Sequence, residues 1–432
     1  RILAPYIGTS TYTWTSLIGV ILAALSLGYW LGGKTADKKP DIKILASTIF
    51  LAGGLVSITI LFKDAVLSVV AATSLPLELK AVLAALILFA PASVFLGFVT
   101  PYAVKLKTKT LDKTGETVGR LYALSTVGSI IGTFAAGFFL IPFVGSSRTL
   151  YFIAGSLFVV SLLLAPFAIS RLNVGLIALF VIGVVAGEAQ TYYLGTNFNY
   201  YDIDTQYSRV RIFDAKHQKD EKPIRAMAID PKFYQSSMYL DSDKLTSEYA
   251  KFYHLVRHYK PDFKKTLMIG GAGYSFPKDY LKTYPEAEMD VVEIDPQMTA
   301  LAKRFFRLKE NPRLKIIHQD GRIFLNQAPT DKYDAVFIDA FTTLFNVPFQ
   351  LTTIEAVSEI KRVLKKDGVV IFNLGGVLKG NGDGFFRAEL KTYQKVFENV
   401  EVFKADLEKE DSKVQNIIIV AKRNSTTIST TS

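Results

Sequence analysis

The sequence predicts two unlike parts, an N-terminal multi-span α-helical membrane region and a C-terminal doubly wound α/β domain. Half of the 432 residues are hydrophobic, and nearly all of the apolar excess lies before residue 190. Beyond that point, short apolar runs alternate with helical stretches, a pattern typical of a mostly parallel sheet. A glycine-rich turn, Gly270 to Gly273, directly follows one of these runs, where such folds bind their ligands.

Six apolar stretches make up the first part. They lie at residues 11–32, 44–62, 81–103, 121–145, 149–169 and 173–187. A helix needs roughly 20 apolar residues to cross a bilayer, and it satisfies its own backbone hydrogen bonds there, so the first five are predicted spans. Pro91 and Pro142 are expected to bend or end helices rather than to line a transport path.

The charged loops between these stretches predict the orientation. The positive residues are Lys34, Lys38, Lys39 and Lys43 after the first stretch, and Lys105, Lys107, Lys109, Lys113 and Arg120 after the third. Lysine and arginine are enriched in cytoplasmic loops, so both loops are expected on the inside. We therefore predict a multi-pass protein of the cell membrane.

The sixth stretch decides on which side the C-terminal part lies. If it crosses the membrane, the loop charges place the rest of the chain outside. With only about 15 residues it is short for a full crossing, so it could be interfacial or re-entrant. Since a nucleoside cofactor is intracellular, we expect the C-terminal domain in the cytoplasm.

The chain is expected to divide at three points. Residues 1–188 form the membrane region, which begins at Arg1 in an apolar context and is expected to be truncated at its N-terminus. Residues 189–262 form a small β-sheet and a lead-in helix, and residues 263–423 form a Rossmann-like nucleoside-binding domain. The Ser/Thr-rich tail, residues 424–432, is expected to be disordered.

Periodicity places the elements of the second part. Alternation at 207–213 and 224–229 predicts a small antiparallel sheet, and a helix is expected at about 246–258. Strands are predicted at 266–270, 289–294, 314–318, 334–339 and 368–373. Helices are predicted at about 276–284, 296–307, 321–327 and 353–364, and a final strand pair at 398–404 and 415–421.

The glycine turn predicts the kind of ligand. Gly271 and Gly273 form G-x-G, but Phe276 stands where the dinucleotide fingerprint needs a third glycine, and no phosphate-binding loop motif occurs. A nucleoside without a pyrophosphate therefore fits better. Glu293, at the end of the second strand, is placed to accept hydrogen bonds from both ribose hydroxyls.

Acidic residues end three successive strands. Glu293 closes the second, Asp320 with Gly321 follows the third, and Asp339 closes the fourth. Asp320 could accept a hydrogen bond from an adenine amino group, which together with Glu293 would complete recognition of adenosine. Asp339 is expected at the centre of the crevice, where a group reacts.

Several kinds of site are excluded or disfavoured. The chain has no cysteine, which excludes thiolate nucleophiles and cysteine-bound metals. His254 and His258 are one helical turn apart but lack the glutamate of a zincin motif, so no metal site is expected. The formal charge of +11 is explained largely by loop lysines between the spans, so no nucleic-acid partner is expected.

These residues resemble the spermidine synthase (polyamine aminopropyltransferase) family, and the complete chain is similar to prokaryotic proteins that fuse a membrane region to such a domain. The matching pieces are Ile229-Asp230 with Gln235, Tyr253-His254, the turn 270–273, Glu293-Ile-Asp295, Asp320-Gly321 and Tyr333 to Asp339. The resemblance implies an S-adenosylmethionine-dependent methyltransferase-like fold. It also implies transfer of an aminopropyl group from decarboxylated S-adenosylmethionine to a polyamine.

The resemblance also implies roles for individual residues. Glu293 would hold the ribose, Asp320 would hold the adenine, and Asp339 would help to remove a proton from the acceptor amine. The glycines of the cofactor site would be Gly270, Gly271, Gly273 and Gly321. Gln235, Tyr253 and His254 would line the acceptor side. The expected partners are the lipid bilayer, a small-molecule amine and, as an assembly, a homodimer.

Two departures keep other functions open. The family has an aspartate where this chain has Gly273, and a second aspartate where it has Thr342. Both missing acids recognise amines. A methyltransferase or other transferase that uses intact S-adenosylmethionine is therefore one alternative, and a non-enzymatic sensor of a polyamine or nucleoside that regulates a transporter is another.

Overall fold

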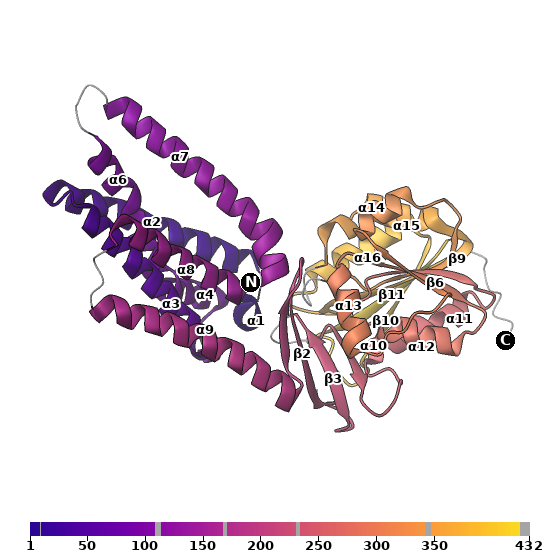
Figure 1. Ribbon diagram of the computed structural model, residues 1–432. Helices are drawn as coiled ribbons and strands as arrows, with labels where there is room; N and C mark the ends of the chain where they lie inside the picture. Colours follow the sequence, from indigo (N-terminus) through magenta and orange to yellow (C-terminus); the bar gives the residue numbers. More distant parts are fainter. Residues whose placement is uncertain (9, 109–113, 167–170, 230–233, 342–346, 424–432) are drawn as a thin grey trace, which may run out of the picture. The chain divides into compact units, whose positions relative to one another are not determined.

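The structure is a computed structural model that describes residues 1–8, 10–108, 114–166, 171–229, 234–341 and 347–423. The chain forms two compact units, Arg1–Val210 and Arg211–Ser432. Each unit has its own hydrophobic clusters and is described by itself (Figure 1).

The first unit is almost entirely helical. Its helices are α1 (Ala4–Ile7), α2 (Thr11–Lys38), α3 (Ile42–Ala72), α4 (Leu77–Leu88), α5 (Ala90–Gly97), α6 (Val99–Lys107), α7 (Thr114–Ala135), the π-helix η2 (Ala136–Val144), α8 (Ser146–Leu164) and α9 (Arg171–Phe198). The short strand β1 (Tyr201–Asp204) follows α9.

Close contacts hold the helices of this unit together. On α8, the Ser161 hydroxyl donates to the carbonyl of Ala46 on α3 at 2.7 Å. A Cβ at Gly28 on α2 would lie 2.2 Å from the carbonyl oxygen of Val94 on α5, so only glycine fits there. Such small residues allow two helix backbones to approach, as they do between helices in membranes.

Among the described residues, five helices are long and apolar enough to cross a membrane. They are Thr11–Lys38, Ile42–Ala72, Thr114–Val144, Ser146–Leu164 and Leu172–Phe198. A sixth is formed by Leu77–Leu88 and Ala90–Lys107 if this pair, which is bent by 53°, is one span. The bend lies next to Pro91, as predicted, because proline cannot continue the helical hydrogen bonds.

The expectation that the sixth apolar stretch is too short is wrong. Helix α9 has 28 residues and continues past Glu188 to Phe198. The guanidinium of Arg148 on α8 donates to both carboxylate oxygens of Glu188, at 2.9 and 2.7 Å. Glutamate ends the apolar stretch but not the helix, because it is itself a good helix former.

The second unit begins with a small antiparallel sheet. It contains β2 (Arg209–Lys216), β3 (Pro223–Ala228) and β4 (Ser236–Tyr239), of which β4 was not predicted. The helix expected at 246–258 is present as three consecutive helical pieces, α10 (Glu248–Lys251), the 3-10 helix η3 (Phe252–Leu255) and α11 (Val256–Tyr259). Tyr253 is fully buried in the tighter middle turn.

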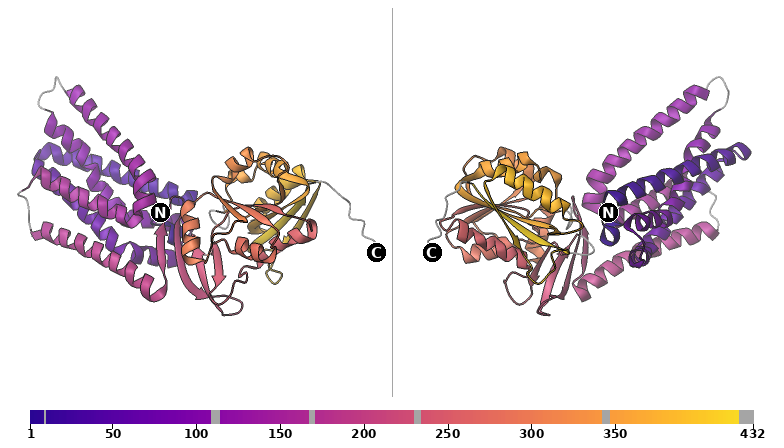
Figure 2. Two further views of the ribbon diagram at one scale, coloured as in Figure 1. Left: turned by 45° about the vertical axis from the view of Figure 1, so that its right-hand side comes forward. Right: turned by 180° about the vertical axis from the view of Figure 1, so that it is seen from behind.

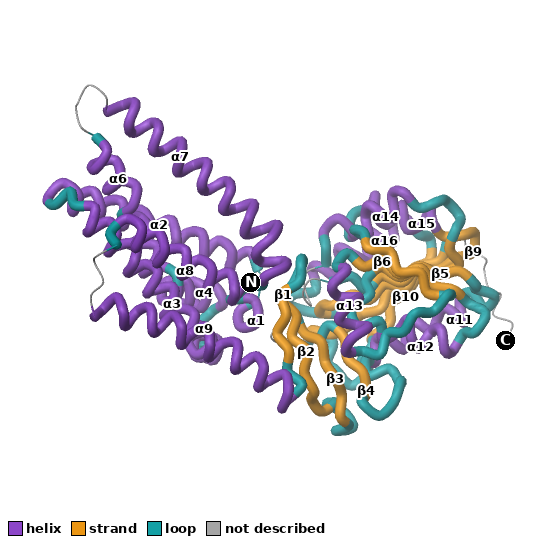
Figure 3. The backbone as a smooth tube through the Cα atoms, in the orientation of Figure 1, coloured by secondary structure: helices purple, strands orange, loops and turns teal. Residues whose placement is uncertain are grey.

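A seven-stranded sheet forms the body of this unit (Figure 3). Its strands are β5 (Lys265–Ile269), β6 (Glu288–Glu293), β7 (Leu314–His318), β8 (Tyr333–Ile338), β9 (Leu364–Val377), β10 (Asn399–Lys404) and β11 (Val414–Lys422), in the order β10-β11-β9-β8-β5-β6-β7. Strand β11 is antiparallel to both neighbours, and the other pairs are parallel. The predicted Rossmann-like alternation is confirmed.

Helices cover both faces of the sheet. They are α12 (Ser275–Thr283), α13 (Pro296–Phe305), α14 (Gly321–Gln327), α15 (Ile354–Val363) and α16 (Gly384–Val396), with a 3-10 turn η4 (Phe349–Leu351) before α15. Val336 and Ile338 of β8 pack with α14, α15 and α16, which lie on one face (Figure 2). Phe337 points the other way and contacts the rings of Phe276 and Tyr280 on α12.

Helix α16 was not predicted from the sequence. Its buried positions are Phe386, Glu389 and Tyr393, so a carboxylic acid occupies the apolar stripe that would reveal the helix. Burial raises the pKa of Glu389 to about 8.

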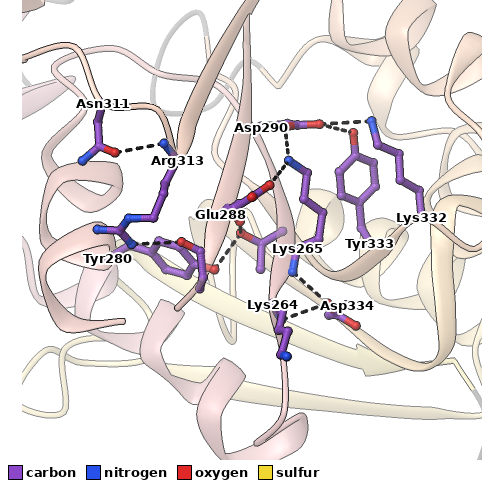
Figure 4. A network of polar contacts seen from close by, with 12 residues as sticks. Lys264, Lys265, Tyr280, Glu288, Asp290, Asn311, Arg313, Lys332, Tyr333 and Asp334 are labelled. Carbon is purple, nitrogen blue, oxygen red and sulfur yellow. Dashed lines mark hydrogen bonds and ion pairs between the residues drawn. The ribbon is translucent and has the colours of Figure 1, made fainter. Parts of the chain in front are cut away.

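Buried ion pairs tie the strands together near their amino ends (Figure 4). Asp290 on β6 accepts from the Tyr333 hydroxyl at 2.8 Å and pairs with Lys265 at 2.8 Å and Lys332 at 3.1 Å. Asp334 on β8 accepts from the backbone N–H groups of Lys264 and Lys265. These carboxylates are therefore satisfied by the fold itself.

Candidate functional site

The site lies where the order of the sheet reverses. The chain runs outward from β5 to β6 and β7, and then returns to place β8 on the other side of β5. Such a switch point opens a crevice beyond the carboxyl ends of the two central strands. Gly270 follows β5 and Asp339 follows β8, and the Asp339 N–H donates to the Ile269 carbonyl at 2.9 Å.

Glycine is required at this crossing. Gly270 has φ +98°, and a Cβ there would lie 2.2 Å from the carbonyl oxygen of Asp339. A Cβ at Gly271 would lie 2.6 Å from the Tyr274 ring, and one at Gly273 would lie 2.5 Å from the Ser236 hydroxyl. The predicted turn is therefore closely packed at these three glycines, and the N–H groups of Gly271 and Ala272 donate to a polar partner.

That partner is Glu293. Its Oε2 accepts from the N–H groups of Gly271 and Ala272 at 2.8 and 3.1 Å, and its Oε1 accepts from the N–H of Asp295 at 2.9 Å. Burial raises the pKa of Glu293 above its usual value, against these three hydrogen bonds, which lower it. The structure thus brings the predicted acid of β6 onto the predicted glycine turn.

Asp320 lies at the start of α14. Its Oδ1 accepts from the N–H groups of Arg322 and Ile323 at 2.7 and 3.2 Å, so it caps the helix, while Oδ2 accepts from Gln350 at 3.4 Å. A Cβ at Gly321 would lie 2.6 Å from the Ile269 side chain. Both residues therefore have local structural roles, and their proposed contact with adenine stays a prediction.

Asp339 is half-buried, and its carboxyl group is held by neutral donors. Asn373 on β9 donates to Oδ1 at 3.0 Å, and the Tyr249 hydroxyl donates to Oδ2 at 3.4 Å. Burial raises the pKa of Asp339 to about 6, although Asn373, Tyr253 and Tyr249 act to lower it. A carboxyl group with this pKa is ionised at neutral pH and can still take up a proton.

A cavity of about 530 Å³ opens beside Asp339. Its wall includes Gln235, Tyr249, Phe341 and Asn373. A second, smaller space is lined by both Asp339 and the glycine turn residues Gly271 and Ala272. The arrangement therefore offers two adjoining places for ligands, with the carboxyl group of Asp339 at both.

The three residues predicted on the acceptor side have different surroundings. Gln235 lines the cavity and donates to the Phe341 carbonyl at 3.3 Å. Tyr253 is fully buried, and burial followed by the charge of Asp339 raises its pKa. His254 instead contacts Asp279 and Tyr284, each at 2.8 Å, and lines neither space. Substrate binding by His254 stays a prediction that this geometry does not favour.

Sequence reasoning missed Asn373 and Tyr249. Asn373 lies in the apolar run of β9, is 2% exposed and has an Oδ1 without a hydrogen-bond partner among the described residues. A lone amide in a buried strand was the available signal, because a buried polar group must be satisfied by something. Asp230 and Thr342, which entered the sequence-based argument, lie outside the described residues.

The strand order and the glycine turn define a Rossmann-like domain, with Glu293 held on the turn. Residues 247–429 match the family model of the spermine/spermidine synthase domain. The resemblance inferred from the sequence motifs is therefore confirmed for this part of the chain.

Individual relatives match over part of their length. A polyamine aminopropyltransferase of Vibrio vulnificus is 32% identical over 141 residues, or 32% of this chain and 45% of that protein. A probable polyamine aminopropyl transferase of Bifidobacterium longum is 24% identical over 212 residues, or 49% of this chain and 46% of that protein. The chain thus spans about half the length of these relatives.

Among solved structures, a probable spermidine synthase from Corynebacterium glutamicum is similar, with a TM-score of 0.43 and 21% identity. The match covers 50% of this chain and 77% of that chain.

Proposed function

We propose that this chain is a membrane-bound transferase that moves an aminopropyl group from decarboxylated S-adenosylmethionine to the amine of a small polyamine. The family match supports the class of reaction. The observation that carries the proposal is the carboxyl group of Asp339, which is half-buried, has a pKa raised to about 6, and lines both the space at the glycine turn and the large cavity.

The reaction needs a proton acceptor. An alkyl amine has a pKa of about 10, so it enters as an ammonium ion without a free electron pair. The Asp339 carboxylate takes one proton, and the nitrogen then attacks the methylene carbon beside the sulfonium. The new C–N bond forms as the C–S bond breaks, and the electron pair leaves on sulfur as methylthioadenosine.

The neighbours of Asp339 fit this role. Asn373 and Tyr249 orient the carboxyl group, and the unpartnered Oδ1 of Asn373 can accept a second N–H of the same amine. Burial raises the pKa of Asp339 toward that of the amine, which makes proton transfer less unfavourable. Gln235 and Tyr253 complete the acceptor side of the proposal.

The donor would lie on the glycine turn. Glu293 would exchange part of its contact with the backbone for the ribose hydroxyls, and Asp320 would use Oδ2 for the adenine amino group. No metal is part of this proposal.

The test is calorimetric titration of the detergent-purified chain with decarboxylated S-adenosylmethionine, intact S-adenosylmethionine and methylthioadenosine. All three share adenosine, so differences report on the donor tail. We expect tightest binding of the decarboxylated donor and release of methylthioadenosine when an amine is added. Failure of all three ligands to bind would overturn the proposal.

One observation favours a second candidate. Gly273 stands where the family carries an aspartate, and it leaves no carboxylate there to hold the amine of an aminopropyl group. A methyltransferase that uses intact S-adenosylmethionine would not need this acid. Preference for the intact donor in the same titration would select that function.

The membrane location can be tested directly because the chain has no cysteine. We propose that the second unit faces the cytoplasm. If all six helices crossed the membrane, the positive charges of the loops would instead place this unit outside. Lys38→Cys and Lys366→Cys place single thiols on exposed residues of the two units. An impermeant maleimide should label neither in intact cells and both after lysis. Labelling of Lys366→Cys alone in intact cells would contradict the proposed side.

A further inference from the structure

The charges of the large cavity do not match a simple polycation. Among the described residues, its wall carries three carboxylates and three cationic side chains: Glu248, Asp339 and Asp406, and Arg211, Lys219 and Lys409. A cavity that selects a diamine should present a net negative potential, because each amine carries a positive charge. Here the formal charges of the wall cancel.

Two of the carboxylates already have partners. Both oxygens of Glu248 accept from Lys251 at 3.0 Å, and Asp406 lies 3.8 Å from Lys219. Neither is an uncompensated anion that could hold a second ammonium group. Asp339, by contrast, has only neutral hydrogen-bond donors around it.

On the cationic side of the wall, one lysine has no ion-pair partner. Lys409, in the loop between β10 and β11, forms no ion pair with another residue of the described ranges. Arg211 on β2 also lines the wall, although it already interacts with another residue. The cavity thus offers an unpaired negative group at Asp339 and unpaired positive charge at Lys409.

We propose that the acceptor is a primary amine that also carries an anionic group, a carboxylate or a phosphate, with the amine at Asp339 and the anion toward Lys409 and Arg211. The proposal deepens the proposed function and rests on it. It replaces the plain polyamine as acceptor with an amine of mixed charge and keeps the donor and the role of Asp339. Such an amine complements the wall, whereas a plain diamine leaves its second charge beside cations.

The test compares acceptors that differ by one charged group. Putrescine is compared with ornithine, which is the same diamine with a carboxylate, and cadaverine with lysine. Ethanolamine is compared with ethanolamine phosphate and with vesicles of an aminophospholipid, which separates a soluble phosphate from a lipid headgroup. We expect kcat/KM to be roughly tenfold higher for at least one anionic member of these sets, equivalent to one favourable charge contact.

Charge reversal supplies the control. Lys409→Glu should remove or reverse the preference, whereas Lys413→Glu, an exposed lysine that does not line the cavity, should leave it unchanged. Higher kcat/KM for the plain amine in every set, or an equal response of both variants, would overturn the inference while leaving aminopropyl transfer intact. Transfer to none of these amines, together with no binding of the decarboxylated donor, would instead refute the proposed function.

Discussion

The two edges of the seven-stranded sheet treat their acids in opposite ways. At the amino edge, Asp290 and Asp334 are surrounded by lysines, and hydrogen bonds from these partners outweigh burial and hold the pKa of each carboxyl group below its usual value. At the carboxyl edge, burial raises the pKa of Glu293 and Asp339, and neither forms an ion pair among the described residues.

This difference separates structural acids from acids available for chemistry. A paired carboxylate stabilises the fold but cannot readily accept a proton or a ligand. An unpaired acid that is shielded from water destabilises the fold, and such acids occur preferentially where a ligand or a reaction uses them. The comparison therefore favours the carboxyl edge as the place where a ligand or a reaction uses acidic groups.

The largest expected effect is on turnover. Asp339→Asn removes the proton acceptor and should lower kcat by about 100-fold to 10,000-fold, because general base catalysis is of that size. Binding of methylthioadenosine should remain within a few-fold, since the turn and Glu293 are unchanged. Unchanged turnover in a folded variant would contradict the role of this acid.

The amino edge should show the reverse pattern. Asp290→Asn removes one partner from a buried cluster with two lysines and should lower the free energy of unfolding by roughly 3 kcal/mol, measured by urea denaturation. Activity per folded molecule should not change.

The effect of Asp290→Asn should also depend on pH. Because the pKa of Asp290 is lowered in the folded state, its stabilisation is present above about pH 4 and is lost as the pH falls. The gap between variant and parent should therefore shrink in acid. A gap that widens there would show that the ion pairs do not stabilise this edge.

Glu293→Gln should lower both the free energy of unfolding and the affinity for methylthioadenosine, with smaller effects than those of the two preceding variants. An amide cannot accept at both of its heavy atoms, so one or two backbone N–H groups of the turn lose their partner. We expect a loss of about 2 kcal/mol in stability and a weakening of methylthioadenosine binding by roughly tenfold or more. Loss of stability with normal binding would restrict Glu293 to holding the turn.

The smallest effect concerns the pH dependence of the rate. Asp339 must be ionised to accept a proton, so kcat/KM should rise with pH through about 6. Asn373→Leu removes a hydrogen bond that lowers the pKa of Asp339, and the acid limb should move up by about one pH unit. An unmoved limb with reduced activity would mean that Asn373 acts only on the acceptor.

The sequence by itself determined the strands, the glycine turn and the acids that end the strands. These features depend on local periodicity and on backbone conformations that only glycine adopts readily, so they are visible without neighbours. Only the tertiary structure decided which groups meet Asp339. Asn373 is 34 residues away in the chain and Tyr249 is 90 residues away, and β9 and α10 bring them together. The same holds for Glu188, whose partner Arg148 lies on another helix, 40 residues away in the chain. Burial of one face leaves a periodic pattern in the sequence, but the choice of a distant polar partner leaves none.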